Sequence, residues 1–397
     1  MSTTEANSSH VINFYDRVAR SPTRNSLIHR DQTRILYLRN FNNWIKSIFI
    51  SEYLDKCRSR FRTNRISNAL DLCCGKGGDQ YKWALGAVNH VTFIDISSGS
   101  VDVCKSRYQQ LCRRRYRLYT ADFHVADCTK DLTETVFRDR VYDLISCQFS
   151  FHYAFESLTQ ARNFLKNVSS CLRNGGFYIA TIPNAYELVR RANVAYKSLQ
   201  TQANTDSTTE PSSISFGNSV YSVNIPSTSF SIRQLDAGSD DKSVRPYLQF
   251  PLFGARYEFH LEGAVDCPEF LVYPPLLNHL AAEQGLFPVT DPIPFQEYFY
   301  EMLSNRTSSS EDPFELLTKM KALECWPNPS CSCDNDWQDD DDRRPKLVGS
   351  AEADAYAHVE QWVEKADDPK CCPFLGTLSK AEWDVVTLYS LVAFQKR

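Results

Sequence analysis

The sequence predicts an α/β fold in which helices cover both faces of a seven-stranded, mostly parallel sheet. Short apolar runs that fit buried strands alternate with stretches that fit helices, as is typical of parallel sheets. The first run, Ala69 to Leu72, leads into a turn that contains Gly75, Gly77 and Gly78. The next run, His90 to Asp95, ends in an acid about twenty residues after that turn. Strand, glycine turn, helix and acidic strand end together indicate a nucleotide-type cofactor site.

The composition is that of an ordinary globular protein. The chain has 397 residues, of which 42% are hydrophobic and 23% are charged, and this length allows one large domain or two. The first ten residues lack the profile of a signal peptide, and no apolar run approaches the roughly 18 residues of a membrane helix. Because the net charge is −4, any recognition of phosphate has to come from a local group of cations. We expect a soluble protein without a membrane partner.

The cysteines favour free thiols rather than disulfides or a metal site. Fourteen cysteines occur without a secretory signal, which is typical of a reducing compartment. A metal cluster would have to come from the C-terminal group of Cys325, Cys331, Cys333, Cys371 and Cys372. The spacing of these residues matches no C-x-x-C pair, so we expect no bound metal.

Three segments precede the glycine turn. Residues 1–30 predict a polar N-terminal arm that is mobile at its start. Apolar side chains recur near helical spacing from Ile35 to Leu54, which predicts one long amphipathic helix or two short ones. This segment is either a packing helix or a ligand lid, because its apolar face is interrupted by Asn42, Asn43 and Lys46. The basic run from Lys56 to Arg65 fits either a solvated linker or a phosphate contact.

The rest of the chain continues the alternation and then departs from it. Further strands of the sheet are expected at Phe123–Asp127, Tyr142–Phe149, Phe177–Thr181 and Thr387–Phe394. Helices are expected at Asp79–Leu85, Gly99–Arg115, Leu158–Leu172, 185–197 and Leu271–Gly285. Tyr257 to Val265 fits an edge or antiparallel strand. Residues 198–245 are rich in Ser, Thr, Asn and Asp and predict a low-complexity insertion with one strand-like island at 219–225, and residues 331–344 predict an acidic surface loop.

The glycine turn and several longer runs carry a family resemblance. From Asp71 to Gly78 the turn ends in Gly-x-Gly-Gly, which resembles S-adenosylmethionine (SAM) methyltransferases more than the G-x-G-x-x-G of dinucleotide enzymes. Longer runs resemble the eukaryotic messenger-RNA cap guanine-N7 methyltransferases. They are Tyr37-Leu-Arg-Asn-Phe-Asn-Asn-Trp44, Ser146-Cys-Gln-Phe-Ser-Phe-His-Tyr153, Pro251-Leu-Phe-Gly254 and Glu262-Gly-Ala-Val-Asp-Cys-Pro-Glu-Phe-Leu-Val-Tyr-Pro274. The resemblance implies one catalytic domain over 31–397 with the Rossmann-like seven-stranded SAM-methyltransferase fold.

The resemblance implies SAM as cofactor, S-adenosyl-L-homocysteine as its product, and no metal. The family's cofactor positions correspond to Lys46 near the methionine carboxylate, Cys73 and Gly75 in the turn, Asp95 at the ribose, Asp127 and Cys128 at the adenine, and Gln148 and Tyr153 beside the cofactor. These roles suit the residue types, since a cation pairs with a carboxylate and an acid accepts from a diol.

The resemblance also implies a site for the cap. The positions near the triphosphate or its base correspond to Asn42, Asn43, Lys76, Lys82 and Arg107, where cations suit phosphate and amides suit base or ribose edges. At the guanine, His152 is expected to donate to O6, Glu269 to accept from N1–H and the 2-amino group, and Tyr389 to lie against the ring.

The implied reaction needs no acid or base. N7 of guanine carries a lone pair and no proton, so it can attack the methyl group without a general base. The protein has to hold donor and acceptor in line, about 3 Å apart. A carboxylate or aromatic face near the base would favour the shift of positive charge onto the guanine. We therefore expect His152, Tyr153, Glu269 and Tyr389 to act by positioning only.

The sequence departs from the family pattern at Cys73, where the family has a glycine. If this position needs a positive φ, a cysteine costs about 1 kcal/mol or more; if φ is negative, the backbone contact to SAM survives. The insertion and the acidic loop have no match either.

Two alternatives stay open. One is a SAM methyltransferase for another guanine-containing or small-molecule substrate, and the other is a catalytically silent RNA-binding subunit of the same fold. Intact Gly75, Asp95, Asp127, His152 and Glu269 favour an active enzyme over the silent subunit. The family implies capped RNA as partner and the nucleus as location. Further partners that it suggests are an activating subunit, other capping enzymes and RNA polymerase II.

Overall fold

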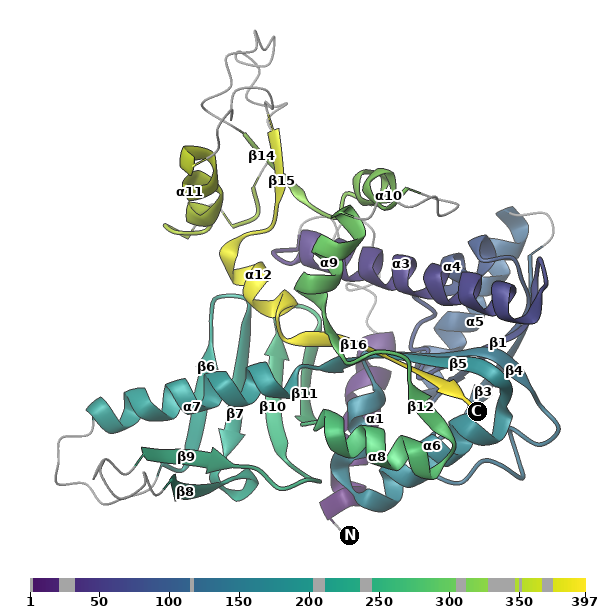
Figure 1. Ribbon diagram of the computed structural model, residues 1–397, viewed down its shortest axis with the longest axis horizontal. Helices are drawn as coiled ribbons and strands as arrows, with labels where there is room; N and C mark the ends of the chain where they lie inside the picture. The colour runs from purple at the N-terminus through teal and green to yellow at the C-terminus, as the bar shows by residue number, and fades with distance from the viewer. Residues whose placement is uncertain are drawn as a thin grey trace, which may run out of the picture.

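The main sheet confirms the predicted fold class. The computed structural model describes residues 3–20, 33–114, 118–202, 211–235, 245–304, 312–327, 347–349, 352–365 and 374–397. The strand order is β12-β16-β5-β4-β1-β2-β3, and β13 pairs beside β16, which makes one strand more than the predicted seven (Figure 1). The five neighbouring strands β5, β4, β1, β2 and β3 are parallel to one another. Strand β16 runs antiparallel to its two neighbours, β5 and β12. Their bounds are β1 (Ile66–Leu72), β2 (Val88–Asp95), β3 (Thr120–Val125), β4 (Tyr142–Gln148), β5 (Leu172–Pro183), β12 (Leu286–Pro288), β13 (Ile293–Pro294) and β16 (Tyr389–Lys396).

Helices cover both faces of this sheet. Successive strand residues point to opposite faces, so Ala69 and Phe93 join the core beneath α3, whereas Leu70 and Ile94 join the core beneath α6 and α8. Because both faces are buried, the strands read as continuous apolar runs. The segment expected as one or two helices is a single helix, α3. The bounds are α3 (Leu36–Phe61), α4 (Gln80–Leu85), α5 (Ser98–Arg114), the 3-10 helix η2 (Phe151–Glu156), α6 (Leu158–Cys171), α8 (Pro274–Glu283), α9 (Phe295–Ser304) and α10 (Pro313–Lys319).

A second, antiparallel sheet corrects the prediction for residues 198–245. Its order is β11-β10-β7-β6, and β6 and β7 come from that segment. Ile214, Val223 and Ile225 are at most 2% exposed, because apolar residues alternate with Ser and Asn and so gather on one face. The low-complexity interpretation is wrong for β6, whereas β7 confirms the strand-like island expected at 219–225. Residues 203–210 and 236–244 lie outside the described residues. The bounds are α7 (Ala185–Gln202), β6 (Ser213–Gly217), β7 (Tyr221–Pro226), the 3-10 helix η3 (Ser227–Ser229), β8 (Ser231–Leu235), β9 (Arg245–Gln249), β10 (Arg256–Leu261) and β11 (Val265–Phe270).

A helix also corrects the prediction of an N-terminal arm. Helix α1 (Thr3–Arg20) packs against α5 and β11 and lies between the two sheets in Figure 1. Phe14 and Ala19 are buried, and a Cβ on Gly99 of α5 would lie 3.3 Å from the Ala19 Cβ. The arm was expected because the first ten residues are polar, but apolar side chains recur at helical spacing from Val11 onward. Residues 11–19 therefore belong to the folded domain, and residues 21–32 lie outside the described part.

The C-terminal part adds a small unit beside the main sheet. It consists of β14 (Glu324–Pro327), β15 (Phe374–Thr377) and α11 (Ala357–Lys365), and α12 (Lys380–Val386) leads from it into β16. Arg34 lies 2.9 Å from Glu352 and 3.3 Å from Glu382, which ties this unit to the start of α3. The predicted acidic loop at 331–344 lies outside the described residues.

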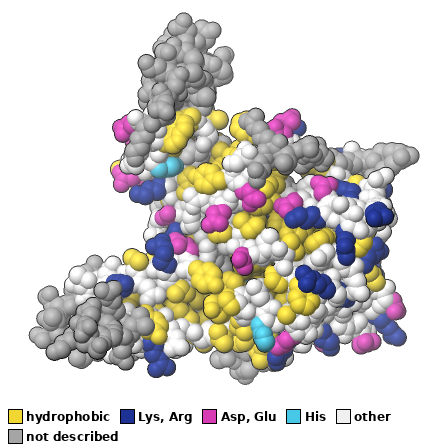
Figure 2. All heavy atoms as spheres, viewed as in Figure 1, with side chains coloured by type: hydrophobic (Ala, Val, Ile, Leu, Met, Phe, Trp, Pro, Cys, Tyr) yellow, Lys and Arg dark blue, Asp and Glu magenta, His cyan; other side chains and the backbone are white. Residues whose placement is uncertain are grey.

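The basic run forms the end of a helix. Figure 2 shows Lys and Arg side chains gathered on the side of the molecule where α3 ends, and the last turn of α3 carries Arg58 and Arg60. Arg58 donates to the Gly86 carbonyl at 2.9 Å and pairs with Asp55. Arg58 therefore belongs to a packed helix end and not to a solvated linker, while the phosphate contact stays a prediction. None of the helices in the described ranges is long and apolar enough to span a membrane.

Candidate functional site

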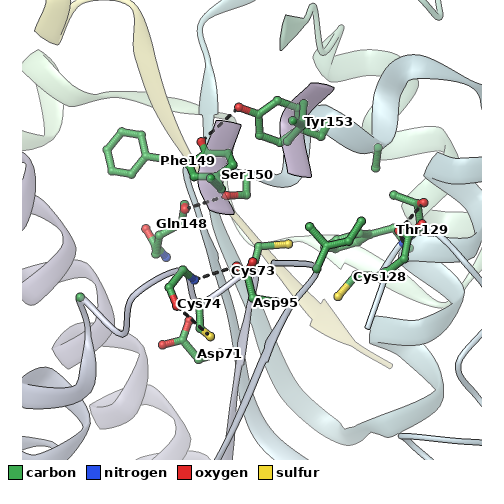
Figure 3. Close-up of a pocket in the computed structure, with 18 of the residues that line it drawn as sticks. Asp71, Cys73, Cys74, Asp95, Cys128, Thr129, Gln148, Phe149, Ser150 and Tyr153 are labelled. Carbon is green, nitrogen blue, oxygen red and sulfur yellow. Dashed lines mark hydrogen bonds between the residues drawn. The ribbon is translucent and has the colours of Figure 1, made fainter. Parts of the chain in front are cut away.

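A cavity of about 420 Å³ opens where the parallel strands end. Its walls come from the turn after β1, the ends of β2, β3 and β4, the start of η2, and helices α1 and α3. Figure 3 shows side chains from these elements converging on one space. All eight predicted cofactor residues line it, namely Lys46, Cys73, Gly75, Asp95, Asp127, Cys128, Gln148 and Tyr153.

Asp95 ties the end of β2 to the glycine turn. One carboxylate oxygen accepts from the Gly75 amide at 2.7 Å and the other from the Ser97 amide at 2.9 Å. Burial raises the pKa of Asp95 to about 6, the neighbouring Cys73 adds to this, and the two amides oppose it. The carboxylate is therefore fixed at the edge of the cavity, with its charge sensitive to mildly acidic pH.

Lys46 is already paired in this structure. Its Nζ lies 2.8 Å from Asp79 Oδ1, and the Nζ of Lys82 lies 2.7 Å from the same oxygen. Burial alone would raise the pKa of Asp79, but the two ammonium groups hold it below its ordinary value. Asp71 shares this corner, and its pKa is raised to about 8 by burial and by Asp79. Asp79 was missed as a site residue, although it directly follows the glycine turn.

The walls around Asp127 and Gln148 contain one buried group without a hydrogen-bond partner among the described residues. Asp127 Oδ1 accepts from the amide and the hydroxyl of Thr129 at 2.9 and 2.7 Å, so its loop is closed by its own side chain. Gln148 donates to the Ser146 hydroxyl at 2.9 Å, while its Oε1 is buried without a hydrogen-bond partner in the described chain. Because buried polar atoms are normally satisfied, this oxygen fits a cavity that holds a polar ligand.

Cys73 adopts the conformation that favours glycine. Its φ is +55°, and that of Gly75 is +52°. The thiols of Cys128 and Cys147 hydrogen bond toward Cys73 and lower the pKa of its thiol well below the ordinary value. The side chain is thus accommodated by a group of sulfur atoms rather than excluded from the turn.

Replacing Cys73 by glycine is expected to leave SAM binding unchanged. Glycine removes the strain of a positive φ, about 1 kcal/mol, while the loss of a mostly buried thiol costs a similar amount. The melting temperature of Cys73→Gly should stay within about 4 °C of the wild type. Calorimetry with SAM measures the affinity. A loss of more than about tenfold would mean that the sulfur itself contacts the cofactor.

The residues expected at guanine form a buried cluster. Glu269, which is 4% exposed, accepts from the Tyr257 hydroxyl at 2.7 Å, and its other oxygen lies 3.5 Å from His152 Nε2. Both ring nitrogens of His152 are buried without a hydrogen-bond partner among the described residues. The ring of Tyr389 packs edge-on against Phe149, with the centroids 5.0 Å apart. The cavity of about 420 Å³ is not lined by His152, Glu269 or Tyr389. It is lined by two of their neighbours, Tyr153, which packs against His152, and Phe149, which packs against Tyr389.

The other predicted cap residues divide into two groups. Lys76 and Arg107 line the cofactor cavity, where Lys76 donates to the Val18 carbonyl at 2.8 Å and Arg107 to the Lys76 carbonyl at 3.0 Å. Asn43 and Lys82 line a separate cavity of about 1220 Å³ beside α3 and α4. Asn42 lines neither cavity, and its Oδ1 is buried without a hydrogen-bond partner in the described chain. The structure thus brings the cofactor residues together and leaves the cap residues spread around that centre.

Sequence reasoning missed two further residues. Phe149 lines the cavity with φ of +60°, and its place between Gln148 and Ser150 in a quoted run was an available signal. Tyr15 of α1 also lines the cavity, and its hydroxyl lies 3.3 Å from that of Tyr153. Nothing in the local sequence around Tyr15 indicated this, because the contact depends on how α1 packs.

In the described ranges no group of three or more His, Cys, Asp or Glu side chains is arranged to hold a metal ion.

Comparisons with known proteins identify the family. The family profile described as the mRNA (guanine-N(7))-methyltransferase domain matches residues 1–397. The mRNA cap guanine-N(7) methyltransferase of Drosophila melanogaster is 36% identical over 374 residues, covering 92% of this chain and 73% of that protein. The Caenorhabditis elegans protein of that name is 31% identical over 394 residues, covering 98% and 87%.

Plant and bacterial proteins extend the comparison. The mRNA cap guanine-N(7) methyltransferase 1 of Oryza sativa is 34% identical over 304 residues, covering 75% of this chain and 70% of that protein. A solved SAM-dependent methyltransferase from Clostridium acetobutylicum aligns with 72% of this chain and 90% of its own, at 15% identity and a TM-score of 0.38. From the full-length profile match and the relatives above 30% identity, we conclude that this chain belongs to the mRNA (guanine-N7)-methyltransferase family.

Proposed function

We propose that this protein transfers a methyl group from SAM to N7 of the guanosine that caps messenger RNA. The observation that carries the proposal is that the cavity with the predicted cofactor residues lies next to the buried cluster of His152 and Glu269. Tyr153 lines the cofactor cavity, and its ring centroid lies 4.3 Å from that of His152, which is 3.5 Å from Glu269. A cofactor-sized cavity therefore adjoins the buried Glu269 carboxylate and the His152 imidazole, which has no hydrogen-bond partner among the described residues. Both groups suit the edge of a guanine.

The cavity fits SAM. Its volume lies within the range of small-molecule sites, and the buried Gln148 Oε1, which has no partner in the part of the chain that the structure describes, offers an acceptor inside it. When bound, SAM supplies an electrophilic methyl group on its sulfonium. Asp95 would accept from the ribose hydroxyls and Asp127, with Cys128, would border the adenine. Cys73 and Gly75 would hold the methionine end through their backbone, with Lys46 near its carboxylate once this lysine exchanges its contact with Asp79.

The guanine would meet groups that position it without exchanging protons. Glu269 would accept from N1–H and the 2-amino group, and His152 would donate to O6. Tyr389 would lie against the ring beside Phe149. Toward the triphosphate, Lys76 and Arg107 border the cofactor cavity, while Asn43 and Lys82 line the separate cavity beside α3 and α4. Asn42 lies on α3 next to Asn43. Because the guanine cluster is buried, admission of the base requires that its neighbours move apart.

Methyl transfer from labelled SAM tests the proposal. The wild-type protein is incubated with GpppA-capped RNA, with the same RNA carrying an uncapped 5′ triphosphate, and with free GTP. Label retained on capped RNA alone supports the proposal. Label on GTP or on uncapped RNA would indicate another guanine-containing substrate. Binding of capped RNA without any transfer would identify a silent RNA-binding subunit.

The affinity for SAM is expected to fall in mildly acidic solution. Because burial raises the pKa of Asp95 to about 6, this carboxylate is ionised at neutral pH and gains a proton as the pH drops through that value. A protonated carboxyl loses charge-assisted hydrogen bonds, so the dissociation constant should be flat above about pH 7 and rise up to about tenfold per unit below pH 6. Calorimetry between about pH 5 and 8 measures it, with Asp95→Asn as control. A wild-type affinity that does not change over this range would contradict the assignment.

The proposed substrate also indicates partners and location. We propose that the protein acts on 5′-capped RNA in the nucleus, where messenger RNA is made, and releases S-adenosyl-L-homocysteine. An activating subunit, the other capping enzymes and RNA polymerase II are the partners to test by co-purification.

A further inference from the structure

Helix α1 is hydrogen bonded to two of the loops that border the cofactor cavity. Asp16 Oδ1 accepts from the Ser97 hydroxyl and from the Gly99 amide, the latter at 3.2 Å, in the loop that follows Asp95. Lys76 of the glycine turn donates to the Val18 carbonyl at 2.8 Å. The helix is therefore tied to the two segments proposed to hold the ribose and the methionine of SAM.

These contacts place Tyr15 between the two halves of the site. Its hydroxyl pairs with that of Tyr153 at 3.3 Å, and either oxygen can be the donor. Burial raises the pKa of Tyr15, and the neighbouring Cys267, Glu269 and Asp95 raise it further. Asp95, which is assigned to the ribose, and Glu269, which is assigned to guanine, therefore both lie close enough to raise the pKa of the Tyr15 hydroxyl. Helix α1 also packs on β11, the strand that carries Glu269.

We propose that Tyr15 is a positioning residue for methyl transfer, acting through Tyr153. This inference rests on the proposed function. Tyr153 lines the cofactor cavity, and its ring packs at a tilt of 41° against that of His152, so the direction of its hydroxyl decides how the wall between cofactor and base is shaped. The bond to Tyr15 fixes that direction. When one hydroxyl donates to the other, a single proton of the pair is left to point toward a ligand, which orients the wall before the substrate arrives.

Single-turnover methyl transfer by Tyr15→Phe tests the inference. The variant keeps the ring and loses only the hydroxyl, so we expect the rate at saturating SAM and capped RNA to fall about tenfold, the loss that corresponds to one hydrogen bond. The affinity for SAM should change less than about threefold. The matched control is Tyr298→Phe on α9, which removes another buried hydroxyl that donates to Glu52 at 2.9 Å. The control should lose a similar amount of thermal stability and keep its rate.

A double-mutant cycle of Tyr15 and Tyr153 distinguishes a positioning role of Tyr15 from a general loss of structure. Tyr153→Phe should slow the reaction to at least the same degree, and adding Tyr15→Phe to it should have no further effect. Independent, multiplying effects would overturn the inference, as would a Tyr15→Phe rate within twofold of the wild type. A faster reaction with Tyr15→Ala would also overturn it, because the side chain would then be an obstacle to the base. Failure of the wild type itself to methylate capped RNA would reject the proposed function and this inference together.

Discussion

Asp95→Ala is expected to remove SAM binding from a protein that still folds. The carboxylate is held at the cavity edge by the amides of Gly75 and Ser97, in the place from which it would accept from two ribose hydroxyls. Losing two charge-assisted hydrogen bonds lowers the affinity roughly 100-fold or more. The measurement is calorimetric titration with SAM at pH 7.5, where the wild-type carboxylate is ionised.

The fold should tolerate Asp95→Ala because two effects of the substitution on stability oppose each other. Alanine leaves two backbone amides without their acceptor, which destabilises the fold, but it also removes a carboxylate whose charge burial disfavours. These effects oppose each other, so the melting temperature should fall by no more than several degrees. Asp122→Ala, on the neighbouring strand β3, removes a partly exposed acid paired with Arg140 and serves as the control for losing a strand carboxylate. An Asp95→Ala protein with unchanged SAM affinity would sink the ribose assignment.

Glu269→Gln is expected to slow methyl transfer to GpppA-capped RNA by roughly 10- to 100-fold or more. The amide keeps the shape and can still accept from the Tyr257 hydroxyl. It loses the charge, however, and turns a donor toward the N1–H and 2-amino edge of the base. SAM affinity should hardly change, because Glu269 does not line the cofactor cavity. Glu262→Gln, an exposed position on the turn between β10 and β11, is the matched control.

The pH dependence of the same reaction distinguishes positioning from base catalysis. Because N7 has no proton to remove, single-turnover transfer by the wild type at saturating SAM should be flat from about pH 6.5 to 8.5. The Gln variant should run parallel to it at a lower rate. A steep rise with a midpoint near about pH 7 that disappears in the variant would mean that a titrating base acts. The positioning mechanism would then have to be abandoned.

The sheet and the cofactor half of the site could be predicted because their signals are local. The runs at 69–72 and 90–95 are apolar throughout, since parallel strands are buried on both faces. The glycine turn and the acid at the end of β2 mark one edge of that sheet. Parallel strands carry their carboxyl ends to the same edge, so the eight residues predicted for SAM meet in one cavity.

The burial of two segments was not predicted, although the strand-like island at 219–225 was, because this burial depends on distant partners. Residues 213–226 are polar on average, but β7 pairs with β10, and this places Val223 and Ile225 in a core. Residues 11–19 belong to a helix whose buried face, with Phe14 and Ala19, packs against α5 and β11. The average polarity of a segment does not reveal a buried apolar face, because the polar residues between the apolar ones point to solvent.

The sequence by itself determined the α/β class, the edge of the sheet at which the cavity opens, and, through its longer runs, the family. The tertiary structure alone decided the positive φ of Cys73, the pairing of Lys46 with Asp79, and the meeting of Tyr15 with Tyr153 across 138 residues of chain. It also placed His152 beside Glu269, which comes from the other sheet. The physical reason is that side-chain periodicity shows which face of an element is buried, whereas the partner on that face is set by how the two sheets and α1 pack together.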